Sequence, residues 1–122
     1  MRISQLLRIG FAYAALVCGV SEASARMLLM ASHYGGPKDH ASQRTADGTP
    51  FRRGYDSGIC AHRSWRFGTR LRLINPRNGR VAYCTVHDRG PFVQGRQLDI
   101  AYAAAVQLGM DGLGVLEVEI LH

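Results

Sequence analysis

Residues 69–88, TRLRLINPRNGRVAYCTVHD, decide the fold of this chain. Within residues 69–74 leucines and arginines alternate, and a period of two is typical of a strand with one buried face. The turn at 76–79 ends in Asn-Gly, the dipeptide that favours a hairpin, and residues 81–87 read as the returning strand. A Gly-Pro pair soon afterwards ends the regular structure. The stretch therefore predicts a β-hairpin.

Around this hairpin the sequence predicts further short strands and one helix. Three segments are apolar, alternating or extended and read as strands, at residues 27–34, 97–100 and 115–121, and residues 58–62 resume an ordered segment. Residues 101–108 are rich in alanine, a strong helix former, and Gly109 follows as a helix stop. Residues 35–56 are polar and predict a long surface loop, which is often functional in a small domain. Several short strands without a β-α-β rhythm predict a mainly β domain, built as a small barrel.

The N-terminal segment, residues 1–25, has the layout of a signal peptide. Arg2 and Arg8 supply positive charge, an apolar run follows, and a small-x-small site ends at Ala25. We therefore expect export and cleavage after Ala25. The alternative is a membrane anchor, but the apolar run is shorter than the about 20 residues that span a bilayer. We expect no lipid on Cys18, because the residue before it is not small.

Cleavage would leave residues 26–122 as one domain, since 97 residues are enough for one core and not for two. Removing the signal lowers the formal net charge from +6 to +5. A basic exported domain meets anionic polymers of the cell envelope more often than nucleic acid, so we expect no nucleic-acid partner. The alternative is that the charge serves solubility alone.

Two cysteines, Cys60 and Cys84, remain in the exported part. In an oxidising compartment such a pair predicts a disulfide bond. The loop that it closes would add roughly 3 to 4 kcal/mol to the free energy of unfolding in the chain-entropy model. The alternative is a pair of buried free thiols.

Asp88 and His62 are the candidates for chemistry. Asp88 ends a strand, and a carboxyl group partly removed from water keeps its proton to higher pH, as a general acid must. The alternative is an aspartate at a turn that only accepts hydrogen bonds from nearby backbone amides. His62 could hold Asp88 or relay a proton, or a backbone carbonyl could simply satisfy it.

The two cysteines bear on whether His62 and Asp88 can meet. His62 lies two residues after Cys60, and Asp88 four after Cys84, so in extended chain each pair shares a face. If the cysteines are bonded and the segments run parallel, the two groups lie on one face with an offset of roughly 6 to 7 Å. If the segments are antiparallel, the groups point to opposite ends. The sequence leaves the direction open, and parallel pairing in a small barrel requires crossed connections.

Three other features have plainer interpretations. Asp99 precedes the alanine-rich helix, which favours a helix cap. His87 alternates away from Asp88 and should be exposed. No pair of histidines has a convincing metal-ligand spacing, so we expect no metal.

A basic stretch with interleaved aromatic residues follows His62. Its arginines are Arg63, Arg66, Arg70, Arg72, Arg77 and Arg80. Aromatic faces can stack on sugar rings, and arginines can bind carboxylates. The alternative is a solvated strand face with core aromatics, which we expect for Phe67 and Tyr83. The pattern could also indicate nucleic-acid binding, but the signal peptide argues against it.

Several motifs together resemble a known family. They are ASHYG at residues 31–35, FGTRL and NPRNGR at 67–71 and 75–80, HDRGPF at 87–92, LDI at 98–100, AAA at 103–105 and LGM at 108–110. In this order, and across almost all of the exported part, they resemble the rare lipoprotein A family. Expansins share the barrel of that family and are a more distant match.

The resemblance implies a six-stranded double-psi β-barrel, whose crossed connections would supply the parallel pairing. It also implies lytic transglycosylase activity on peptidoglycan glycan strands stripped of their stem peptides, without a cofactor. Asp88 is then the acid and base, His62 matches a functionally important histidine, and Asp99 matches an acidic position in the same groove. We expect three further residues to bind substrate, namely Tyr34, Trp65 and Arg89.

One departure from the family keeps other functions open. Members often read TANGE in the long loop, whereas residues 45–49 here read TADGT, so Thr49 replaces a carboxylate. Asp47, two residues earlier, could compensate. The leading hypothesis is an exported, monomeric transglycosylase of the periplasm or cell envelope. The alternatives are a non-catalytic, expansin-like module that binds or loosens the wall, and an accessory protein that binds a protein partner.

Overall fold

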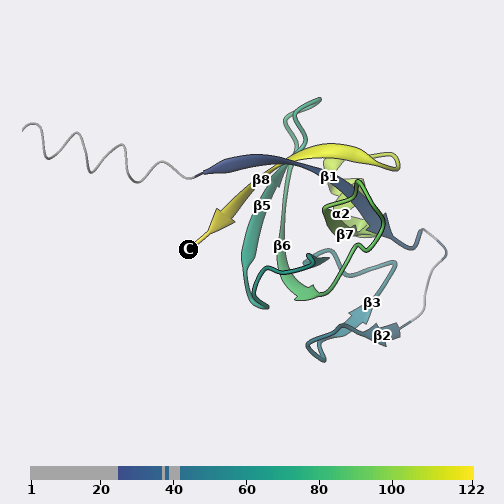
Figure 1. Ribbon diagram of the computed structural model, residues 1–122. Coiled ribbons are helices and arrows are strands. Elements are labelled where there is room, and N and C mark those ends of the chain that lie inside the picture. The colour runs from purple at the N-terminus through teal and green to yellow at the C-terminus, as the bar shows by residue number, and fades with distance from the viewer. Residues whose placement is uncertain (1–24, 37, 39–41) are drawn as a thin grey trace, which may run out of the picture.

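The structure, a computed structural model, describes residues 25–36, 38 and 42–122 (Figure 1). Cys18 and all but the last residue of the predicted signal peptide lie outside the described residues. Six strands close a barrel in the order β1-β7-β4-β6-β5-β8. They are β1 (Arg26–Tyr34), β4 (Ile59–Ala61), β5 (Arg70–Ile74), β6 (Val81–Asp88), β7 (Leu98–Ala101) and β8 (Gly114–Leu121). The prediction of a mainly β, six-stranded barrel is confirmed.

The predicted hairpin is formed by β5 and β6. The two strands pair antiparallel, from Ile74 opposite Val81 to Arg70 opposite Thr85. Gly79 in the turn has a φ of 75°, a left-handed conformation that glycine adopts without strain. The leucines of β5 are fully buried while Arg70 is exposed, so the alternation in the sequence does mark the inner and outer faces.

The barrel closes through two parallel pairs of strands. β1 runs parallel to β7 and antiparallel to β8, and β4 runs parallel to β6 and antiparallel to β7. Because these neighbours are not consecutive in sequence, the chain must cross over between them. The direction that the sequence left open for β4 and β6 is therefore the parallel one.

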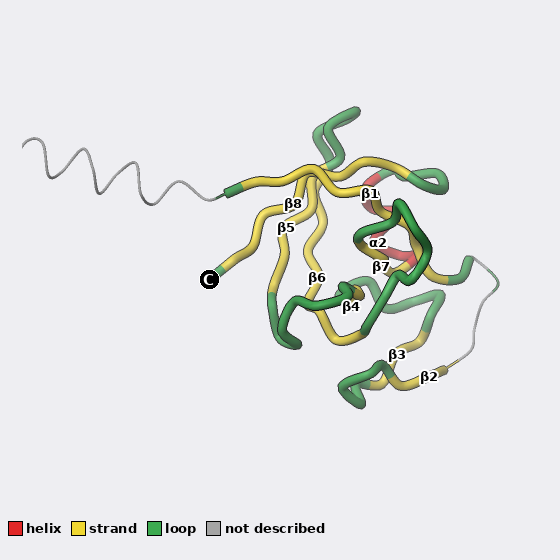
Figure 2. Tube along the Cα trace, viewed as in Figure 1, coloured by secondary structure: helices red, strands yellow, loops and turns green. Residues whose placement is uncertain are grey.

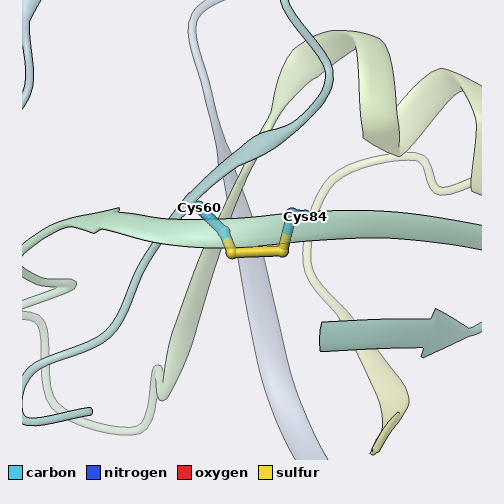
Figure 3. The surroundings of a disulfide bond; sticks show 2 residues. All are labelled: Cys60 and Cys84. Atoms are coloured by element: carbon cyan, nitrogen blue, oxygen red, sulfur yellow. A yellow bond between two sulfur atoms is a disulfide. The ribbon is translucent and has the colours of Figure 1, made fainter. Parts of the chain in front are cut away.

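A disulfide bond joins Cys60 of β4 to Cys84 of β6 (Figure 3). The Cα atoms of the two cysteines are 5.8 Å apart, and both side chains are buried in the core. The predicted bond is confirmed. It ties together the two parallel strands that lead to His62 and Asp88.

Helix α2 (Tyr102–Leu108) follows β7 directly and packs against β6, β7 and β1. Two of its alanines and Leu108 are buried against the barrel, and Gly109 ends it in the left-handed conformation that the sequence predicts for a stop. The predicted cap at Asp99 is wrong. The N-cap is Ala101, which makes no side-chain cap, because β7 continues through Asp99 up to the helix.

The predicted long loop contains a second, small sheet. β2 (Ser42–Arg44) and β3 (Pro50–Arg52) pair antiparallel outside the barrel (Figure 2). Phe51 anchors this hairpin, because its side chain is almost completely buried and packs edge-on against the Tyr34 ring at 5.2 Å between centroids. The turn at residues 45–49, between β2 and β3, reaches the end of β6, where the Asp47 N–H donates to the His87 carbonyl.

The expectation of core positions for Phe67 and Tyr83 is wrong. Phe67 is 40% exposed and Tyr83 is 58% exposed. Tyr83 lies on the outward side of β6, between the buried Ala82 and Cys84, so strand alternation rather than hydrophobicity decides its position. Phe67 lies in the connection before β5, where the Arg89 guanidinium covers its ring.

Within the described residues no helix is long and apolar enough to cross a membrane. The same part of the chain contains no group of three histidine, cysteine, aspartate or glutamate side chains that could hold a metal ion.

Candidate active site

Asp88 is the last residue of β6, and three donors surround its carboxylate. Oδ1 accepts the backbone N–H of Ala46 at 2.9 Å and that of Arg89 at 3.0 Å. Oδ2 accepts the Tyr34 hydroxyl at 3.1 Å. Only the Arg89 amide is local in sequence. The other two donors come from the end of β1 and from the turn at 45–49, so three separate segments of the chain converge on this side chain.

Tyr34 supplies the side-chain donor to Asp88. Burial raises the pKa of Tyr34 above its usual value, and the negative charges of Asp88 and Asp99 raise it further. The phenol therefore keeps its proton at neutral pH and can serve as a donor. Edge-on packing against Phe51 holds the ring in place.

His62 follows β4, and its backbone N–H donates to the Asp88 carbonyl at 3.3 Å. Its ring Nδ1 accepts the backbone N–H of Ser64 at 3.1 Å and that of Trp65 at 3.0 Å. Burial lowers the pKa of His62, with smaller contributions from Arg63 and Arg89. An Nδ1 that accepts two hydrogen bonds belongs to a neutral ring whose proton sits on Nε2. His62 thus offers one remaining donor, Nε2–H.

The structure brings His62 and Asp88 together through the backbone. No hydrogen bond joins their two side chains in the described part of the chain. The His62 ring instead stacks on Trp65, with centroids 3.8 Å apart and planes 7° apart. That the imidazole and the carboxylate act on one substrate stays a prediction.

Arg89 braces the segment that carries His62 and Trp65. Its Nη1 donates to the carbonyl of His62 at 3.2 Å and to that of Trp65 at 2.8 Å. The guanidinium lies 3.8 Å from the centroid of the Phe67 ring. These contacts give Arg89 a positioning role, and its predicted role in substrate binding stays a prediction.

Asp99 lies close to Asp88 along the wall of the barrel, with β4 between their two strands. In the pairing of the strands, Asp88 is opposite Ala61, Ala61 is opposite Asp99, and Asp99 is opposite Ser32. Burial raises the pKa of Asp99, although the Ser32 hydroxyl, at 3.2 Å, favours the charged form. The charge of Asp88 also raises it. The two carboxyl groups and Tyr34 therefore form one electrostatic cluster.

The prediction that His87 is exposed is wrong. Its Nδ1 is 2.7 Å from Asp47 Oδ2 and 3.2 Å from Thr49 Oγ1, and its side chain is only 25% exposed. Alternation does turn His87 away from Asp88, but the turn at 45–49 folds over that side of β6. Sequence reasoning missed this contact, and it missed the Ala46 amide, because nothing local in the sequence reports where a long loop folds back.

A solvent-open hollow of about 410 Å³ lies elsewhere on the barrel. It is lined by Gly58, Arg70, Leu71, Tyr83, Cys84, Thr85 and Leu121. None of these residues is a predicted catalytic or substrate-binding residue. The candidate site is defined by the convergence of side chains on Asp88 and not by this hollow.

Comparisons with known proteins agree with the fold. The sequence model of a family described as "Lytic transglycolase" matches residues 29–120. A protein of Nostoc sp. named "Probable endolytic peptidoglycan transglycosylase RlpA" is 45% identical over 91 residues, which cover 75% of this chain and 24% of that protein. A protein of the same name from Aquifex aeolicus is 46% identical over 94 residues, or 75% of this chain and 40% of that protein.

The chain spans less than half the length of these relatives. The solved structure of the Streptomyces papain inhibitor matches 80% of this chain and 96% of its own, with a TM-score of 0.60 and 16% identity. That likeness concerns the fold alone. The family match covers the barrel from β1 to β8 and includes every residue of the Asp88 cluster, and the chain therefore belongs to the lytic transglycolase family of double-psi β-barrels.

Proposed function

We propose that the protein is an endolytic peptidoglycan lytic transglycosylase. It would cleave the bond between N-acetylmuramic acid and N-acetylglucosamine in glycan strands stripped of their peptides, and leave 1,6-anhydro ends. Support comes from the family and from the names of the relatives. The observation that carries the proposal is the Asp88 carboxyl group, held at the end of β6 by Tyr34 and two amides, with Asp99 nearby.

In the proposed reaction Asp88 acts first as acid and then as base. It gives a proton to the glycosidic oxygen, and the bond from that oxygen to the muramic acid C1 breaks. The C6 hydroxyl of the same sugar attacks C1 and returns its proton to Asp88. Atoms balance without water, so the two-carboxylate arrangement of hydrolases is not required.

His62 and its neighbours would bind the sugar. The free Nε2–H of His62 can donate to a sugar oxygen, and the stacked Trp65 ring keeps the imidazole in one orientation. Asp99 and Tyr34 would line the same groove. Arg89 would act mainly through the segment that it braces, although its remaining N–H groups can bind the lactyl carboxylate of muramic acid.

We also propose that the protein works outside the cytoplasm, in the periplasm or cell envelope, as a monomer of residues 26–122 without a cofactor. Peptidoglycan lies there, and the N-terminal segment has the pattern of a signal peptide. A buried disulfide fits an oxidising compartment.

One observation favours a second function, a non-catalytic module that binds or loosens the wall. Thr49 stands where the family often has a carboxylate, and its hydroxyl faces His87 and provides no acid. If that carboxylate is indispensable, the groove would bind glycan without cleaving it.

Product analysis separates the two functions. The purified protein is incubated with amidase-stripped glycan strands, and the products are analysed by mass spectrometry beside Asp88→Asn and His62→Ala. Asp56→Asn is a matched control, because the Asp56 carboxylate accepts the Arg52 N–H within its own turn next to β3. Anhydro ends from the wild type and the control, but not from Asp88→Asn, support the enzyme. Glycan binding without products supports the module.

A further inference from the structure

The turn at residues 45–49 is attached to the end of β6 at two consecutive residues. Asp47 Oδ2 lies 2.7 Å from His87 Nδ1, and the Asp47 N–H donates to the His87 carbonyl at 3.1 Å. One residue earlier in the turn, the Ala46 N–H donates to Asp88 Oδ1 at 2.9 Å. The contact to His87 therefore sets the position of the amide that reaches Asp88.

The second oxygen of Asp47 organises the turn itself. Oδ1 accepts the Thr45 hydroxyl at 2.7 Å and the Thr49 N–H at 3.1 Å. The Thr45 N–H donates to the Thr49 carbonyl at 2.9 Å, which closes the turn, and the Thr45 side chain is buried. A single carboxylate thus shapes the turn with one oxygen and fixes it to β6 with the other.

The surroundings of Asp47 do not suit an acid. The hydrogen bond with His87 is the main cause that lowers the pKa of Asp47 well below its usual value. A carboxylate that stays ionised has no proton to give. Asp47 is thus not a substitute acid for the carboxylate that is missing at residue 49, and any contribution must come through Asp88.

We infer that Asp47 and His87 are positioning residues for Asp88. Their contact clamps the turn so that the Ala46 amide holds Asp88 Oδ1, which leaves Oδ2, beside the Tyr34 hydroxyl, to face the glycosidic oxygen. The part of this inference that concerns the reaction rests on the proposed function. The clamp would let the site work with Thr49, because its backbone closes the turn and its side chain needs only to contact His87.

A double-mutant cycle tests the clamp. Asp47→Asn, His87→Gln and the double variant are compared with the wild type and with Asp56→Asn. We expect each single variant to lower kcat on stripped glycan about 10- to 100-fold with little change in KM, since a misplaced catalytic group slows the chemical step. Because the two side chains act as one unit, the double variant should lose no more activity than the less active single variant. The inference would be overturned if the decrease in kcat of the double variant equalled the product of the two single decreases. It would also be overturned if the single variants had the same kcat as the Asp56→Asn control.

Hydrogen exchange of the Ala46 amide, followed by NMR, provides a readout that does not need activity. The amide should be protected in the wild type and in Asp56→Asn, and should exchange at least about tenfold faster in both single variants, since local opening controls exchange. Unchanged protection in Asp47→Asn and His87→Gln would refute the clamp. If the wild type makes no anhydro ends but the Ala46 amide behaves as expected, the proposed function fails while the clamp is upheld.

Discussion

Tyr34 and Asp88 form a pair in which a neutral donor supports a carboxyl group. The raised pKa of Tyr34 keeps its hydroxyl protonated, and Asp88 Oδ2 accepts it. Tyr34→Phe keeps the ring that packs on Phe51 and removes only this donor. We expect kcat to fall about 10- to 100-fold, while the free energy of unfolding changes by only about 1 kcal/mol. Product assays and urea denaturation measure the two effects. An unchanged kcat would show that Asp88 does not need the phenol.

The His62 ring should stay neutral below the pH at which a free histidine becomes charged. Its pKa is lowered, so the folded protein binds this proton less readily than the unfolded chain. The stability linked to His62 is therefore complete above about pH 6.5 and is lost as the pH falls below it. Trp65 is the only tryptophan and stacks on the ring, so its fluorescence reports the charge of His62. We expect a midpoint below about pH 6.5 that His62→Gln abolishes. A midpoint at or above that value would contradict the neutral donor.

The charge of Asp99, which the proposed site uses, should lower the free energy of unfolding at neutral pH. Burial raises the pKa of Asp99, so the ionised group destabilises the fold at neutral pH. This effect disappears as the pH falls below about 4, because there the unfolded chain also binds the proton. Asp99→Asn keeps an oxygen for the Ser32 hydroxyl and removes the buried charge. We expect urea denaturation to give a higher free energy of unfolding at pH 7, a difference that shrinks towards about pH 4, and product assays to give a lower kcat. A variant that is less stable at neutral pH would argue against this interpretation.

Strands β4 and β6 depend on their disulfide. Cys60 and Cys84 are both buried, and the chain between them contains the segment that Arg89 braces and the β5–β6 turn. The double variant Cys60→Ala, Cys84→Ala should lower the free energy of unfolding by about 3 to 4 kcal/mol. Urea denaturation with and without a reductant measures it, and the reductant should weaken the wild type but leave the double variant unchanged. A loss below about 1 kcal/mol would mean that the pairing of β4 with β6 is stable without the disulfide.

Elements with local signals were predictable, and those that depend on distant contacts were not. Alternation and the Asn-Gly turn predict β5 and β6, and alanines with Gly109 predict α2, because each signal lies within the element. The β2–β3 hairpin has no such signal. It depends on the contact of Phe51 with Tyr34 and on that of Asp47 with His87, and only the closed barrel creates these contacts.

At the scale of the whole molecule, the crossed connections create the site. Parallel pairing of β4 with β6 puts His62 beside Asp88, and β7 between β4 and β1 adds Asp99 and Tyr34 nearby. Once a direction was given, the spacing from the cysteines could predict that His62 and Asp88 lie at the same end of the strand pair. It could not predict the register, because a shift between Cys60 and Ala61 puts Ala61 and not His62 opposite Asp88. The sequence alone also left the direction open. The hydrogen bonds that Tyr34 and Ala46 donate to Asp88 could not be predicted either, because they depend on how the barrel closes and where the long loop folds back.

Product formation in heavy-oxygen water tests the central claim most directly. The wild type, incubated with stripped glycan strands, should release anhydro-ended products that carry no heavy oxygen, because the C6 hydroxyl and not water attacks the sugar. Asp88→Asn should release at least about 100-fold less of them. Products that incorporate heavy oxygen, or an Asp88→Asn variant as active as the wild type, would contradict the proposed reaction.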